Sequence, residues 1–207
     1  IRIPPSLSMP IISFGQGGRN KSLVNYSTEA VAAYQIVSRL DMLLFMPILG
    51  IAISLTTIVG MFYGAKEFDK LLSVVNYGIN RAVLITTISV IFFFVLASNI
   101  LPIFSSNPLV IDIGVTYLKI IILVYPAVGI SVICSRVCQA LGHGMPLLIT
   151  TITRVIILTA PLSYYFYFTG RPIEWVWFSQ VFAILVAATI SFAWMRYYFR
   201  KFNIVRN

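Results

Sequence analysis

The sequence contains few of the residues that carry catalysis or bind metals, with six acidic residues, one histidine and two cysteines among 207. Acid–base and metal-assisted reactions need such groups in clusters, so we do not expect an enzyme. Cys134 and Cys138 lie four residues apart in one predicted helix, where disulfide geometry is poor. With His143 they would offer three ligands at spacings unlike those of structural zinc sites. We therefore predict helix-packing cysteines and a histidine in a capping loop, with no metal and no cofactor.

Charge is also scarce, since only 10% of the residues are charged while 59% are hydrophobic. The mean hydropathy is +0.93, which excludes an ordinary soluble domain and indicates a protein of the lipid bilayer. The net charge of +9 comes from cations scattered at the ends of apolar segments. They form no contiguous basic stripe of the kind that a phosphate backbone requires, so nucleic acid is not an expected partner.

The first residues lack the basic start, short apolar run and small-residue cleavage site of a secretory signal. The chain also begins with Ile1. We therefore expect a fragment, or the second half of a longer protein.

Hydropathy predicts an all-α membrane protein with six transmembrane segments, near residues 5–26, 35–62, 77–101, 113–141, 146–168 and 176–199. Pro126 removes a backbone hydrogen bond in the middle of the fourth segment and predicts a bend there. The first segment is interrupted by the polar run Gly15–Ser22. It is either a short helix followed by an external loop or a broken helix that lines a cavity.

The distribution of cations favours termini on the cytoplasmic side of the membrane. Seven cations fall on the side of the termini (Arg2, Lys66, Lys70, Arg196, Arg200, Lys201 and Arg206) and four on the other (Arg19, Lys21, Arg39 and Arg171). Because cytoplasmic loops carry the excess of lysine and arginine, this count predicts cytoplasmic termini.

The second segment carries polar residues that an apolar helix should not need. At 100° per residue, one stripe of this helix holds Gln35, Arg39, Met42, Met46, Gly50, Thr57 and Met61. We expect that stripe to face protein or water. Lys119, Arg136, Asp41 and Arg154 also fall within segments, where ionisable residues are costly and mark candidate functional sites. Asp41 lies well off the stripe, so a structural ion pair is favoured over a role in ion coupling.

Several motifs resemble the second half of transporters of the multidrug and toxic compound extrusion (MATE) family. They are TEAVAAY followed by SRLD, the spacing Pro47 to Gly50, the loop VGMFYGAKEFDK, and the junction CQALGHGMPLLI followed by Arg154. The resemblance covers nearly the whole chain in the same order. It implies that residues 1–207 form one six-helix lobe of a two-lobed, twelve-helix transporter, with the N-terminal lobe as its partner.

The resemblance further implies a cation-coupled antiporter that exports amphipathic, often cationic compounds. Some members carry an acid in the first and fourth helices of this half, but the matching stretches here are ISFGQ and PAVGIS. The coupling proton or sodium ion is therefore expected in the other half. The open alternatives are a related flippase of lipid-linked oligosaccharide, with a larger and more cationic cavity, and a non-transporting membrane subunit.

On this basis we predict a multi-pass protein of a prokaryotic plasma membrane. The candidate substrate-cavity residues are Gln16, Asn20, Gln35, Met42, Met46 and Tyr125. Asp41 and Arg154 are candidate gating or pairing groups.

Overall fold

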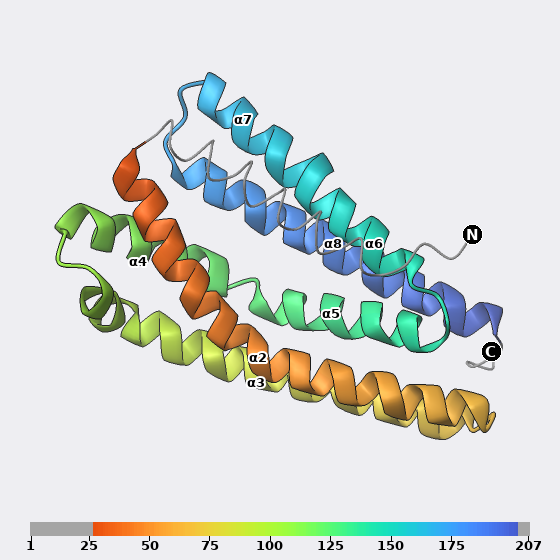
Figure 1. Ribbon diagram of the computed structural model, residues 1–207. Helices are drawn as coiled ribbons and strands as arrows, with labels where there is room; N and C mark the ends of the chain where they lie inside the picture. The colour runs from red at the N-terminus through yellow and green to blue at the C-terminus, as the bar shows by residue number, and fades with distance from the viewer. Residues whose placement is uncertain (1–26, 203–207) are drawn as a thin grey trace.

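The structure is a computed structural model that describes residues 27–202. This part of the chain is a bundle of helices running alternately in opposite directions (Figure 1). The elements are α2 (Thr28–Gly64), α3 (Phe68–Phe104), α4 (Pro108–Ile122), α5 (Tyr125–Ala140), α6 (Met145–Ile152), the π-helix η2 (Thr153–Thr159), α7 (Ala160–Phe168) and α8 (Glu174–Lys201).

Within residues 27–202, four helical stretches are long and apolar enough to cross a membrane, one of them formed by α6, η2 and α7 together. A fifth span results if the bent pair α4 and α5 is counted as one. These five match the predicted segments from 35–62 to 176–199, which confirms the all-α membrane fold. The predicted first segment, 5–26, lies outside the described residues.

The helix α2 begins directly after Ser27, whose side chain caps one of the free amide groups of the first turn. Ser27 has extended backbone angles, and its hydroxyl accepts a hydrogen bond of 3.0 Å from the amide of Ala30. The helix then runs without interruption through Pro47 and changes direction about halfway along its length (Figure 1). A proline inside a helix causes such bends because it lacks the amide hydrogen and crowds the preceding turn.

The turn between α2 and α3 is shorter than the sequence predicts. The charges near Lys66 and Lys70 suggest a solvated loop as far as Asn76, but α3 already begins at Phe68. Leu71 and Val75 lie four residues apart on one face and are fully buried, so the first turns of α3 form an amphipathic helix.

The fourth predicted span is broken as expected. The axes of α4 and α5 differ by 52° across Leu123 and Val124, which confirms the bend predicted from Pro126. Since Pro126 has no amide hydrogen, the carbonyl of Ile122 cannot receive the usual bond from four residues later.

The fifth span contains a stretch of π-helix that was not predicted. In η2 the turns are wider, and the amide of Ala160 bonds to the carbonyl of Val155, five residues back. Pro161 follows at once and cannot continue the regular pattern of bonds, so the wider turn satisfies the backbone in another way.

The helix α5 lies at the centre of the packing and contacts α2, α3, α6 and α8. The core divides into two apolar clusters along the bundle. One surrounds the aromatic side chains of Tyr34, Tyr117 and Trp177, and the other surrounds Leu71, Cys138 and related residues near the α2–α3 turn.

Candidate functional site

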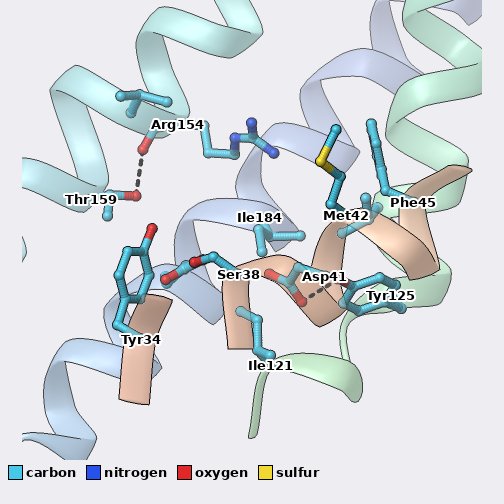
Figure 2. Close-up of a pocket in the computed structure, with 13 residues that line it drawn as sticks. Tyr34, Ser38, Asp41, Met42, Phe45, Ile121, Tyr125, Arg154, Thr159 and Ile184 are labelled. Atoms are coloured by element: carbon cyan, nitrogen blue, oxygen red, sulfur yellow. Dashed lines mark hydrogen bonds between the residues drawn. The ribbon is translucent and has the colours of Figure 1, made fainter. Parts of the chain in front are cut away.

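A polar pocket opens inside the bundle, next to the aromatic core cluster (Figure 2). Its volume is about 330 Å³. It is lined from α2, from both sides of the α4–α5 break, from η2 and from α8, by Tyr34, Ser38, Asp41, Met42, Phe45, Ile121, Tyr125, Val128, Arg154, Val155, Thr159, Gln180 and Ile184.

Asp41 and Tyr125 form the central polar contact of this pocket. The Tyr125 hydroxyl donates a hydrogen bond to Oδ1 of Asp41 (Figure 2). Tyr125 is the first residue of α5 and is 6% exposed. The bond therefore ties the middle of α2 to α5 directly beyond the break. Hydrogen bonds to a carboxylate are about twice as strong as neutral ones.

Asp41 is also distinguished from the other acidic residues by its position. The other five are Glu29, Glu67, Asp69, Asp112 and Glu174, and each lies in a turn or within the first five residues of its helix. Only Asp41 occurs well inside a long helix, 13 residues after Thr28. It is half-buried in the pocket wall.

Arg154 enters the pocket from the π-helix. Its side chain extends from η2 toward the region above Asp41 (Figure 2). The hydroxyl of Thr159 donates a hydrogen bond of 2.7 Å to the carbonyl of Arg154, five residues back. This bond links the last residue of η2 to its second residue. One guanidinium and one carboxylate thus line the same cavity.

A cluster of aromatic rings lies beside the pocket. Tyr34 stacks on Trp177 with ring centroids 6.4 Å apart, and Tyr117 lies 4.2 Å from the same indole. The Tyr117 hydroxyl donates to Oε1 of Gln180 at 3.4 Å, and Gln180 lines the pocket. Of these three rings only Tyr34 lines the pocket, so the aromatic core cluster borders a pocket that also carries charged and amide groups.

The structure brings together four of the residues selected from the sequence, namely Asp41, Met42, Tyr125 and Arg154. Gln35 and Met46 do not line this pocket and are exposed. Gln16 and Asn20 lie outside the described residues. The roles assigned to all these residues stay predictions.

Four lining residues with polar groups were missed, namely Tyr34, Ser38, Thr159 and Gln180. Ser38 could have been found, because it precedes Asp41 by three residues and so shares its helix face. Thr159 and Gln180 carry no such signal, since they reach the pocket only through the packing of η2 and α8.

All seven residues of the polar stripe of α2, from Gln35 to Met61, are exposed. Met42, Met46 and Met61 are exposed by 67%, 56% and 69%. Apart from Met42, which lines the pocket, the stripe therefore faces away from this lobe's core, and what it contacts stays a prediction.

Four further candidate groups, namely Cys134, Cys138, His143 and Arg136, lie outside the pocket lining. Cys134 and Cys138 are fully buried and free. His143 lies in the turn after α5, where its Nδ1 is 3.0 Å from the carbonyl of Leu141 and its ring centroid is 4.4 Å from that of Tyr198. Arg136 donates to Gln139 on its own helix.

Long apolar helices around a polar pocket are typical of integral membrane proteins that handle polar solutes. Comparison with known proteins is more specific. The MatE family model matches residues 7–165, and the chain belongs to this family.

Individual relatives agree with this assignment. The probable multidrug resistance protein YoeA of Bacillus subtilis is 23% identical over 99% of this chain and 44% of its own length. One solved structure is a MOP superfamily transporter from Pyrococcus furiosus, whose binding pocket is described as having reverse polarity. It is 25% identical to this chain, with a TM-score of 0.88, and the match covers 98% of this chain and 45% of that one. An outward-facing multidrug resistance MATE family transporter gives 25% identity and a TM-score of 0.89 over the same shares.

The chain spans less than half the length of these relatives. It is thus similar to one half of a transporter. The family consists of multi-pass membrane transporters, not enzymes.

Proposed function

We propose that this chain forms the C-terminal six-helix lobe of a cation-coupled antiporter that exports amphipathic, often cationic compounds. The observation that carries the proposal is the polar pocket enclosed by apolar helices in a chain of this family. In such proteins a solute is moved by alternating access, because binding biases which side of the membrane the cavity faces.

The partner of this lobe, in this proposal, is the N-terminal lobe of the same transporter. The exposed stripe of α2 supports this, since Gln35, Arg39 and Thr57 are poorly suited to lipid. The coupling ion is a proton or a sodium ion bound in that other lobe. The protein resides in a prokaryotic plasma membrane with cytoplasmic termini.

The charge of the pocket lining favours an exported solute over the oligosaccharide of the flippase alternative, which predicts a more cationic cavity. The lining carries one acid and one base and thus no excess of positive charge.

The test is transport by the full-length protein reconstituted in vesicles. We expect efflux of a fluorescent cationic dye that requires an imposed proton or sodium gradient and stops when an ionophore collapses it. Vesicles with an unrelated membrane protein are the control. Dye fluxes equal to that control under both gradients would refute the proposal.

A further inference from the structure

One exposed face of α8 carries bulky apolar side chains. At 100° per residue this apolar face is a stripe about 80° wide. Its members, which are 38–54% exposed, are Phe178, Phe182, Leu185 and Phe192. Thr189 is the only polar residue among them, and its hydroxyl donates to a carbonyl of its own helix at 2.8 Å. Membrane helices present such faces to lipid, in contrast to the polar stripe of α2.

The same stripe continues into two arginines near the end of α8. Arg196 and Arg200 follow Phe192 at intervals of four residues, and both are exposed. The guanidinium carbon of Arg196 lies over the ring of Phe192, 5.2 Å from the ring centroid. The side chain of Arg196 therefore folds back toward the apolar face.

The depth of these arginines in a bilayer follows from the neighbouring residues. Trp194 precedes Arg196 by two residues, and tryptophan is enriched at the level of the lipid headgroups. Arg200 lies one turn further along, about 6 Å along the helix axis. The headgroup layer on each side of a bilayer is about 5–7 Å thick. Arg196 thus lies where acyl chains meet headgroups, and Arg200 lies within the headgroup layer.

Neither arginine has an acidic partner in the part of the chain that the structure describes. No ion pair or side-chain hydrogen bond joins Arg196 or Arg200 to residues 27–202, and α8 contains no acid after Glu174. The dipole of α8 favours a cation in the last turn, which accounts for Arg200 but not for Arg196. The ring of Phe192 attracts the charge of Arg196 but leaves the N–H groups along the guanidinium edge open.

We propose that Arg196 and Arg200 bind the phosphate group of an anionic phospholipid whose acyl chains lie along the apolar face of α8. Guanidinium groups suit phosphate because they bind it through two parallel hydrogen bonds. Lys201 adds a third cation beside them, over the ring of Tyr197, and so disfavours the ammonium group of a zwitterionic lipid. A lipid is the partner because the apolar face leads into the site without a break. This binding does not depend on which solute the protein transports.

The test is lipid binding to the purified full-length protein, measured by native mass spectrometry in detergent. Phosphatidylglycerol and phosphatidylcholine with the same acyl chains are titrated separately. One cation near an anionic membrane surface strengthens binding about fivefold, so two arginines should favour phosphatidylglycerol by about 25-fold.

The double variant Arg196→Gln/Arg200→Gln should lose this preference and leave the affinity for phosphatidylcholine unchanged. The matched control is Lys66→Gln/Arg81→Gln, which also removes two exposed cations. Arg81 lies over the ring of Tyr77 at 4.9 Å, much as Arg196 lies over Phe192. Both control positions belong to the hairpin of α2 and α3, whose turn lies at the same end of the bundle as the end of α8 (Figure 1). The control should keep the full preference.

A second variant separates charge from hydrogen-bond geometry. Arg196→Lys/Arg200→Lys keeps both charges but not the planar fork, and should retain part of the preference. Thermal unfolding in the same detergent verifies that each variant is folded. If the glutamine variant does not fold, the lysine variant and the loss of the wild-type preference at high ionic strength supply the test.

Three results would each overturn the inference. The first is equal affinity of the wild type for the two lipids, and the second is a preference that the control variant loses as fully as the α8 variant. The third is displacement of phosphatidylglycerol by excess inorganic phosphate at constant ionic strength, which would show a site for free phosphate in place of a lipid site.

Discussion

The hydrogen bond between Asp41 and Tyr125 should contribute measurably to the stability of this bundle. We consider a double-mutant cycle of Tyr125→Phe and Asp41→Ala. The first removes only the hydroxyl that donates to Asp41, and the second removes the carboxylate that accepts the bond.

The magnitude follows from the surroundings of the bond. Interhelical hydrogen bonds in membrane proteins average about 0.6 kcal/mol and reach about 1.7 kcal/mol, because the unfolded chain also finds partners. Bonds to a charged group contribute about 1.5–3 kcal/mol net. Since Tyr125 is only 6% exposed, we expect a coupling free energy of about 1–2 kcal/mol.

The assay is reversible unfolding of the full-length protein in mixed micelles with increasing denaturing detergent. The free energy of unfolding is measured for the wild type, both single variants and the double variant. Tyr165→Phe, which keeps the ring at an exposed position outside the pocket lining, controls for the loss of a tyrosine hydroxyl. Additivity of the two single effects within about 0.3–0.5 kcal/mol would show that the bond contributes nothing specific, and would refute this reasoning.

Two further predictions concern packing. Gly78 faces α2 so closely that a Cβ there would lie 2.2 Å from a leucine methyl group, whereas a Cβ at Gly60 would meet nothing within 4 Å. Gly60→Ala should therefore leave the free energy of unfolding unchanged or raise it by up to about 1 kcal/mol. The free energy of unfolding of the Gly78→Ala variant should be lower than that of the Gly60→Ala variant by about 1–3 kcal/mol. Equal effects of the two substitutions in the same detergent titration would contradict the close packing of α2 and α3. Cys134 and Cys138 are 0% exposed, so neither should react with a membrane-permeant maleimide until the protein unfolds. The reaction is followed by mass spectrometry. Rapid labelling of the folded protein would show that α5 is not packed as described.

The spans could be predicted from the sequence because each depends on local composition. Five apolar runs correspond to helices or to a bent pair of helices, and Pro126 marked the break between α4 and α5. The start of α3 was placed too late, since the charges near Lys70 concealed the apolar face formed by Leu71 and Val75. The π-helix could not be predicted, because a shift from the α to the π pattern depends on small differences in packing energy.

The pocket was harder to predict than the spans because only Met42 of the polar stripe of α2 lines it. The stripe suggested where polar groups meet the outside of the lobe, and Asp41 lies off it. The same offset turns Asp41 inward, toward Tyr125. Its isolation within a long helix was the better signal, because a carboxylate well inside an apolar segment needs a partner or water.

The prolines of the irregular helices lie close to the pocket. Pro47, Pro126 and Pro161 each lie within two residues of a side chain that lines the pocket. At the latter two the regular α pattern is interrupted, by the α4–α5 break and by the end of η2. In a bilayer such interruptions are tolerated only where protein or a polar cavity surrounds them. Two of the prolines thus lie where the helical backbone is irregular and where helices face one another across the polar groups of the pocket.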